Sequence, residues 1–441
     1  MPVLSDVKIN QIFGQLKPSR EWAFTDVGRS ETNYVTHGYH RYPAKFIPQI
    51  VQKLIKEYTL PGDTVVDPFG GCGTTLVEAK LTGRKSYGFD INPVAKLITQ
   101  AKITPIRPKT LENALNNLIN TYEILSPTTP TININRITYW FDTQTIAELN
   151  RIYVAIKATK DRTVRRLFLC ALSHVLKNCS RWLMKSTKPQ VDPDKAIPSP
   201  IDIFLPHLRS MINRNTQFYS LLQKNKTLGT KTNMRIGDST KELPIWSNSA
   251  DLIITSPPYV TSYEYADLHQ LSLLWFGNDH KYFKKWKHYA KNLDSFRKKF
   301  IGTSLKAKYR SEVLNSSTAE KIIAQLSGRN IGVCKNVTHY FSDMNKSFTE
   351  MFRILKPGHK ACIIIGDTTL QNCHIANSQV AAEQMKKIGF EPVKLIKREV
   401  SNKLITPWRN TENGRFTDSS NPNRKRVYQY EYILIMERPL T

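Results

Sequence analysis

Residues 255–259 read Thr-Ser-Pro-Pro-Tyr and directly follow the apolar run 251–254. The apolar run predicts a buried strand, and two consecutive prolines end it because they lack an N–H group and fix the backbone. Carbonyl and hydroxyl oxygens then lie beside the ring of Tyr259, outside any ladder of hydrogen bonds. Acceptors beside an aromatic face form a site for a flat, amine-bearing ring such as a nucleobase. The alternative is a proline-rich turn packed by a tyrosine.

A glycine-rich loop indicates a second ligand. Residues 67–75 read Asp-Pro-Phe-Gly-Gly-Cys-Gly-Thr-Thr and lie between a strand predicted at 64–67 and a helix predicted at 74–81. Glycine lets the backbone approach a ligand closely, and the first turn of a helix offers free N–H groups. The loop lacks the lysine of a phosphate-binding loop. Taken alone, it could still serve NAD, a phosphate or only a tight turn.

Two acids follow other predicted strands. Asp90 ends the strand at 85–90, where a carboxylate can accept both hydroxyls of a cofactor ribose. The alternative for Asp90 is a cap for the helix that starts near residue 92. Asp238 follows the strand at 234–236 and could receive the amino group of an adenine. An Asx turn or a helix cap explains Asp238 almost as well.

The bulk composition favours a polyanionic partner. The chain has 441 residues, 40% of them hydrophobic, and a formal net charge of +28. An excess of this size, spread along the chain, costs self-repulsion and favours nucleic acid as the partner over a merely lysine-rich surface. The six cysteines form no CxxC pair, so we expect reduced thiols and no metal site. We find no signal peptide or membrane-spanning run and expect a cytoplasmic protein without a membrane partner.

The order of the predicted elements indicates a doubly wound α/β fold. A strand, glycine loop, helix and second strand at 64–90 open such a sheet. Residues 1–35 are expected to form an irregular arm. Residues 409–425 are expected to form a polar loop between two late strands that pair antiparallel at the edge of the sheet. We divide the chain into 1–104 (first part of the core, with the cofactor loop), 105–230 (a mainly helical, basic insertion), 231–261 (core with the catalytic motif), 262–335 (a basic, aromatic insertion) and 336–441 (last part of the core).

The two motifs together resemble those of the S-adenosylmethionine-dependent DNA amino-methyltransferases. The Ser-Pro-Pro-Tyr form is similar to the cytosine-N4 branch, since the adenine-N6 branch more often has Asp or Asn before Pro-Pro. Residues 40–48, His-Arg-Tyr-Pro-Ala-Lys-Phe-Ile-Pro, are similar to the family segment that precedes the cofactor loop and walls the methionine end. The resemblance covers 37–95, 234–265 and 337–437 and leaves both insertions unexplained. Cys72 stands where the family commonly has serine.

The resemblance implies a Rossmann-like methyltransferase fold, with a mostly parallel sheet of seven strands, a C-terminal antiparallel hairpin and helical insertions. It implies S-adenosyl-L-methionine as the cofactor and no metal. We assign cofactor binding to Tyr42, Pro43, Ala44, Lys45, Phe46, Asp67, Pro68, Phe69, Gly71, Gly73, Thr74, Thr75, Asp90, Ile91, Asp238 and Ser239, and catalysis to Ser256, Pro257, Pro258 and Tyr259.

The chemistry of an exocyclic amine fits these assignments. The lone pair of the cytosine N4 amine is delocalised into the ring, so the amine is a poor nucleophile. The hydroxyl of Ser256 and the carbonyl of Pro257 would accept its two N–H groups and favour a pyramidal nitrogen, while Tyr259 stacks on the base. The target atom is unreachable in a duplex, so the base must be flipped out. No cysteine lies near the two prolines, which argues against the covalent route to carbon 5 of cytosine.

The function predicted from the sequence is site-specific methylation of cytosine N4 in double-stranded DNA. The protein would be the protective arm of a restriction–modification system, whose restriction endonuclease acts separately. The alternatives are an adenine-N6 DNA methyltransferase and an RNA amino-methyltransferase. A further alternative, from a different functional class, is a non-catalytic DNA-binding subunit with a cofactor-binding core.

Three basic stretches are candidates for DNA contact. One lies in the first insertion, near residues 181–185. The second, 281–299, interleaves lysine and arginine with aromatic residues, as DNA-facing surfaces do, although a solvated amphipathic helix explains it equally well. The third is the loop at 409–425 with its flank, for which a solvated loop is the alternative. Either insertion could read the DNA. The residues assigned to DNA are Arg181, Lys185, Arg297, Arg409, Arg415, Arg424 and Arg426.

Overall fold

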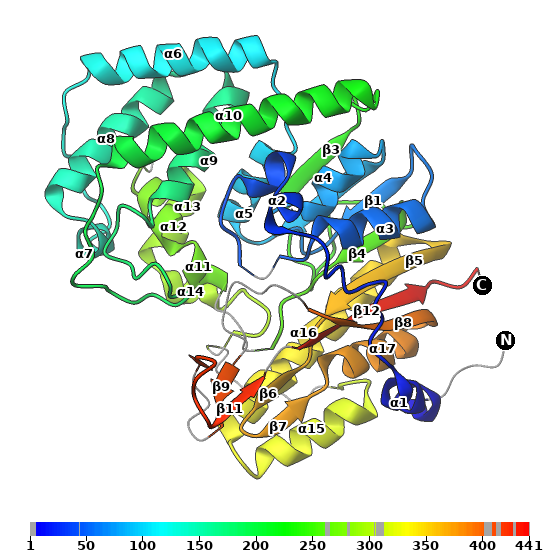
Figure 1. The fold of residues 1–441 in the computed structure, drawn as a ribbon. Coiled ribbons are helices and arrows are strands. Elements are labelled where there is room, and N and C mark those ends of the chain that lie inside the picture. Colours follow the sequence, from blue (N-terminus) through cyan, green and yellow to red (C-terminus); the bar gives the residue numbers. More distant parts are fainter. Residues whose placement is uncertain are drawn as a thin grey trace.

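Seven strands form one sheet in the order β3-β2-β1-β4-β5-β12-β8 (Figure 1). In this computed structural model, which describes residues 6–43, 45–260, 265–279, 283–303, 305, 313–400, 408–411, 416–426 and 429–440, the first five strands of that order pair in parallel. Strand β12 pairs antiparallel with β5 and with β8. The predicted sheet, mostly parallel with an antiparallel C-terminal pair, is confirmed. The strands are β1 (Thr64–Asp67), β2 (Lys85–Asp90), β3 (Thr232–Ile236), β4 (Ala250–Thr255), β5 (Leu355–Ile365), β8 (Glu391–Glu399) and β12 (Tyr430–Glu437).

Helices cover both faces of the sheet. Successive side chains of a strand point to opposite faces. Accordingly, Leu252 and Ile254 pack with the helices of one face, while Ile253 packs with those of the other. A strand buried on both sides must be apolar at nearly every position, which explains the unbroken apolar run before the Ser-Pro-Pro-Tyr motif. The first layer contains α3 (Pro48–Tyr58) and α4 (Thr74–Leu81), and the second contains α16 (Ile331–Ile354) and α17 (Asn377–Ile388).

The two insertions pack together as one helical lobe, which we define as α6–α14 (Figure 1). The ring of Phe141, from the first insertion, contacts that of Trp275 from the second at a centroid distance of 5.7 Å. Each insertion therefore covers apolar surface that the other would expose. The lobe follows α5 (Pro93–Lys102) and contains α6 (Pro108–Ile124), α7 (Arg136–Trp140), α8 (Thr143–Ala158), α9 (Arg162–Val175), α10 (Pro200–Lys224), α11 (Tyr265–Leu268), α12 (Gln270–Asn278), α13 (Lys284–Lys291) and α14 (Leu293–Arg297).

Two segments differ from the prediction. The arm expected to be irregular contains helix α1 (Asp6–Gln15), whose Ile9 is buried in the same apolar cluster as residues of α17. The segment expected as a polar loop instead contains a small antiparallel sheet with β9 between β10 and β11. Backbone pairing forms this sheet without the apolar alternation by which strands are recognised in a sequence. Its strands are β9 (Trp408–Asn410), β10 (Phe416–Thr417) and β11 (Arg424–Arg426).

The remaining elements lie around the sheet. Helix α15 packs against α16 and α17 and so lies with the cover of the sheet rather than with the helical lobe. No helix in the described ranges has both the length and the apolar character needed to cross a membrane. The remaining elements around the sheet are α2 (Arg29–Thr32), the 3-10 helix η1 (Val35–Gly38), α15 (Ser317–Ser327), β6 (Thr368–Leu370) and β7 (Cys373–Ile375).

The shared core of the lobe gives a stability prediction. Phe276 of the second insertion is fully buried, and its ring contacts that of Tyr153 in the first insertion. Phe276→Ala is expected to lower the free energy of unfolding by about 3–5 kcal/mol, because it leaves a cavity at this junction. Urea unfolding followed by tryptophan fluorescence measures the change. The control is Trp246→Ala, at a residue that is 87% exposed. It should change the free energy of unfolding by less than about 0.5 kcal/mol. Equal shifts for the two variants would contradict a shared core.

Candidate active site and cofactor pocket

One pocket lies at the carboxyl ends of β1, β2, β3 and β4, where the strand order of the sheet reverses. Ligands bind at this position in open α/β sheets because the connections on either side diverge. The empty space of the pocket is about 830 Å³ including its open mouth. Its lining comprises Tyr42, Lys45, Phe46, Pro68, Phe69, Gly70, Gly71, Cys72, Thr74, Asp90, Ile91, Gly237, Asp238, Ser239, Ser256, Pro258, Lys299, Phe300 and Ile301.

The glycine loop is held in one conformation by backbone and side-chain bonds. The amide of Gly73 donates to the carbonyl of Gly70 at 2.7 Å, and the hydroxyl of Thr99 donates to the carbonyl of Gly71 at 2.8 Å. Gly73 has φ of +79°, and a Cβ there would lie 2.5 Å from the Thr99 side chain. Glycine is therefore required at this position both by conformation and by space.

Asp90 lines the pocket as a half-buried residue. One of its oxygens accepts the amide of Gly71 at 3.0 Å, and the other accepts that of Asn92 at 2.8 Å. Burial raises the pKa of Asp90 to about 6. Asn92 caps helix α5 with its own side chain, which accepts the amide of Val94. The cap of helix α5 is therefore Asn92 and not Asp90. Each Asp90 oxygen retains a lone pair that can accept a hydrogen bond from a ligand.

Asp67 does not line the pocket. Its carboxylate is 1% exposed and accepts the hydroxyl of Thr255 at 2.6 Å and the amide of Phe69 at 3.1 Å. Burial raises the pKa of Asp67 to about 6, and the bond from Thr255 opposes that rise. The Asp67–Thr255 bond joins the end of β1 to the end of β4. It therefore fixes the glycine loop relative to the Ser-Pro-Pro-Tyr motif.

The catalytic motif presents its first residue to the pocket. Ser256 and Pro258 line it, whereas the side chain of Pro257 is buried and is not part of the lining. Among the described residues, the Ser256 hydroxyl has no hydrogen-bond partner, so it is available to a ligand. The ring of Tyr259 packs on Gly366, where a Cβ would lie 3.0 Å from it. The Tyr259 hydroxyl donates to Glu431 at 3.4 Å.

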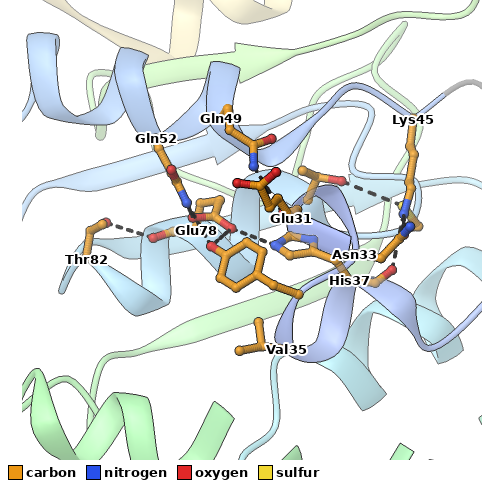
Figure 2. A network of polar contacts seen from close by, with 12 residues as sticks. Glu31, Asn33, Val35, His37, Lys45, Gln49, Gln52, Glu78 and Thr82 are labelled. Carbon is orange, nitrogen blue, oxygen red and sulfur yellow. Dashed lines mark hydrogen bonds and ion pairs between the residues drawn. The ribbon is translucent and has the colours of Figure 1, made fainter. Parts of the chain in front are cut away.

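A buried polar network attaches the wall residues 34–43 and 45–46 to helix α4 (Figure 2). Glu78 of α4 accepts hydrogen bonds from Tyr34 at 2.5 Å and from Gln52 at 3.0 Å, and it pairs with the His37 ring at 2.6 Å. Lys45 extends along the same wall and donates to Asn33 and to the carbonyl of His37. Burial lowers the pKa of Lys45 to about 8. The helix that follows the glycine loop thus positions the wall as well.

The pocket brings together most of the predicted cofactor residues. Asp238 lines it and also forms the predicted Asx turn, because its carboxylate accepts the amide and hydroxyl of Thr240. The Ser239 hydroxyl lies 3.3 Å from that of Ser347. Ala44 lies outside the described residues. Pro43, Asp67, Gly73 and Thr75 stand next to the lining without being part of it, as do Pro257 and Tyr259 of the catalytic motif.

The residues predicted to bind DNA occupy different environments. Arg297 forms ion pairs with Asp267 and Asp294 at 2.5 Å each, so its charge is already compensated. Arg181, Lys185 and Arg424 are exposed. Arg415 lies outside the described residues, as do the side chains of Arg409 and Arg426.

Six pocket residues were not assigned in the sequence analysis, of which Gly70, Cys72 and Gly237 adjoin assigned residues in the same loops, whereas the other three come from a distant part of the chain. Lys299, Phe300 and Ile301 belong to the second insertion and close one side of the pocket. The mixture of lysine and aromatic residues at 281–299 indicated a ligand-facing surface but not contact with this pocket. Only the packing of Phe300 into the lobe and of Ile301 against the sheet cover brings the segment there.

The buried Asp67 gives a pH prediction. Folding raises the pKa of Asp67, so the folded state holds a proton that the unfolded state releases at lower pH. The resulting stabilisation is complete below the pKa of the unfolded chain and is lost as the pH rises toward about 6. Asp67→Asn keeps an acceptor for Thr255 and removes the buried charge. Relative to the original chain, the variant should gain about 3 kcal/mol between about pH 4 and pH 7, the equivalent of two pKa units. Unfolding free energies measured across this range test it, and parallel curves for the two proteins would contradict it.

Comparisons with known proteins show which family the chain resembles. A family model described as DNA methylase matches residues 6–101 and 250–439. The Type II methyltransferase M.MvaI of Kocuria varians is 25% identical over 420 residues, which cover 89% of this chain and 89% of that protein. M.BsoBI of Geobacillus stearothermophilus is 25% identical over 420 residues, covering 83% and 81%. The DNA adenine methyltransferase YhdJ of Escherichia coli is 33% identical over 78 residues, covering 18% and 25%.

The matched stretches include both motifs that form the pocket, the glycine loop and the Ser-Pro-Pro-Tyr run. The stretch between them contains the first insertion, α6–α10. Because the match extends over more than half of the chain, the protein belongs to the DNA methylase family, the S-adenosylmethionine-dependent methyltransferases of exocyclic amino groups in DNA.

Proposed function

We propose that this DNA methyltransferase modifies the N4 amine of a flipped-out cytosine at a specific site in duplex DNA. The observation that carries the proposal is the hydroxyl of Ser256. It lies in the same pocket as the glycine loop and Asp90, and among the described residues it has no other partner. A neutral hydroxyl beside the carbonyl of Pro257 forms an acceptor pair for the two N–H groups of an exocyclic amine.

The pocket suits the cofactor chemically. S-adenosylmethionine supplies a methyl group on a positively charged sulfur. Asp90 has lone pairs for the ribose hydroxyls, and Ile91 and Phe69 offer apolar surface for a planar ring. Lys45 and the amino end of α4 suit a carboxylate. These groups would hold the cofactor in the pocket that Ser256 also lines.

The residues of the motif would prepare the target amine. Ser256 and the Pro257 carbonyl would accept its N–H groups, which favours a lone pair directed at the incoming carbon. Tyr259, braced by Gly366 and Glu431, would stack on the flipped base. Positioning two reactants in line supplies much of the rate enhancement in such transfers.

The proposed biological role is protection of host DNA from a partner restriction endonuclease that acts separately. The support is the similarity to two Type II methyltransferases, M.MvaI and M.BsoBI. We propose cytosine on the strength of serine before the two prolines. The second candidate is adenine N6, supported by the similarity to the adenine methyltransferase of Escherichia coli. An adenine presents an exocyclic amine of the same geometry to the same acceptors.

A transfer assay tests the base and the role of Ser256. The protein is incubated with tritiated S-adenosylmethionine and duplex DNA, and the DNA is digested to nucleosides. Label is expected in N4-methylcytosine, and label in N6-methyladenine would refute the choice of base. Ser256→Ala should lower the rate at least about 100-fold, because one acceptor for the amine is lost, with cofactor affinity unchanged. Full activity of this variant would contradict the assignment.

A binding measurement tests Asp90. Asp90→Asn keeps the size of the side chain but removes the charge that would accept the ribose hydroxyls. Its affinity for S-adenosylmethionine, measured by calorimetry without DNA, should fall about tenfold or more, as for loss of a charged hydrogen bond. Glu112→Gln, at an exposed acid of α6, is the control and should bind normally. Unchanged affinity of Asp90→Asn would remove Asp90 from the cofactor site.

A further inference from the structure

The connection between α9 and α10 contains a short hairpin beside α7. Trp182 and Val191 form an antiparallel bridge. Two backbone bonds flank it, from Leu183 to the carbonyl of Gln190 and from Asp192 to that of Arg181, both at 2.8 Å. We call residues 181–192 the basic hairpin.

The basic hairpin is anchored at its base by aromatic packing. Trp182 is buried and stacks on Trp140 of α7, with a centroid distance of 5.2 Å and an interplanar angle of 22°. The amide of Arg181 also donates to the carbonyl of Trp140 at 2.9 Å. A two-stranded hairpin is marginal by itself, so this packing is what fixes its position.

Two lysines that flank the hairpin in sequence reinforce it. Lys195 donates to the carbonyls of Lys177, Ser180 and Trp182 at 2.7, 2.6 and 3.1 Å. Lys177 donates to the carbonyl of Ser186 near the tip at 2.7 Å. The hairpin is therefore formed before any partner binds, which lowers the entropic cost of association.

The outer surface of the hairpin is positive. Arg181, Lys185 and Lys188 are exposed, and no carboxylate of the described chain is within ion-pair distance of their side chains. Arg297 of the second insertion differs, since two acids compensate it. Uncompensated cations on a rigid projection attract a polyanion.

The base of the hairpin is joined to the wall of the pocket. The guanidinium of Arg41 donates to the carbonyl of His174 at 3.0 Å and to the side chain of Asn178, just before the hairpin. The backbone amide of Arg41 bonds to the His174 ring at 3.2 Å. The next residue, Tyr42, lines the pocket. A duplex held by the hairpin would thus lie beside the site where the base must enter.

We propose that the basic hairpin docks the substrate duplex, with Arg181, Lys185 and Lys188 contacting its phosphates and the two-stranded ribbon entering a groove. The inference rests on the proposed function and assigns DNA recognition to the first insertion. The major groove is wide enough for a two-stranded ribbon. The second insertion then supports the hairpin through the shared core of the lobe.

The test compares two triple variants of the full chain. Arg181→Ala/Lys185→Ala/Lys188→Ala removes the charges of the hairpin. Lys85→Ala/Lys224→Ala/Lys231→Ala removes three exposed lysines. They lie near the amino ends of β2 and β3, whereas the pocket lies at the carboxyl ends of these strands. Binding to a fluorescent duplex is measured by anisotropy at several salt concentrations. Calorimetry with S-adenosylmethionine verifies that each variant keeps its pocket.

The hairpin variant should bind duplex DNA at least about tenfold more weakly, with the slope of log K against log salt reduced by about 2 to 3. The control variant should bind like the original chain. In the transfer assay, the hairpin variant should have a raised KM for DNA and a nearly unchanged kcat.

Other outcomes separate the two proposals. A hairpin variant with the original affinity and salt slope would overturn the inference and leave methyl transfer untouched. An equal loss of DNA affinity in the hairpin variant and the control variant would also overturn the inference, because the overall positive charge of the protein would then explain binding. Tighter, hairpin-dependent binding of single-stranded RNA than of duplex DNA would refute the assigned partner. Absence of methyl transfer by the original chain would refute the proposed function alone, since binding is measured without transfer.

Discussion

The active site depends on two strand ends lying side by side. Strands β1 and β4 are neighbours in the centre of the sheet, and the Asp67–Thr255 bond ties their last residues together. The glycine loop leaves from one and the Ser-Pro-Pro-Tyr motif from the other. Two motifs almost 190 residues apart in sequence, as the separation of 188 between the bonded residues indicates, therefore share one pocket. A shift of either strand by one residue would break this bond, because it turns the bonded side chain to the other face of the sheet.

The helical lobe is a second body built from two distant parts of the chain. Each insertion interrupts the sheet at a different place, yet their apolar faces meet in one cluster. This arrangement lets the second insertion contribute Lys299, Phe300 and Ile301 to the pocket while the first carries the basic hairpin. The lobe thereby connects the cofactor site with the surface that we assign to DNA.

The sequence predicts those features that are local. The glycine loop, the residues of the Pro-Pro-Tyr motif and Asp90 are recognisable because strand, turn and helix signals lie within a few residues of them. Features that depend on distant packing were not predictable. The position of Asp67 in the motif does not reveal whether its carboxylate contacts a ligand or Thr255. Similarly, the sequence around Arg297 does not reveal that folding brings Asp267 within ion-pair distance of it. The strands β9–β11 pair through the backbone and leave no alternation of side chains to detect.

Arg41 and Tyr42 are consecutive residues with different neighbours. Arg41 holds the base of the hairpin, and Tyr42 forms part of the cofactor pocket. If DNA shifts the hairpin, the shift biases the position of the pocket wall, and thermodynamic linkage then requires that the cofactor change the affinity for DNA by the same factor. The two ligands would become mutual effectors through adjacent residues of the pocket wall, without a separate regulatory site.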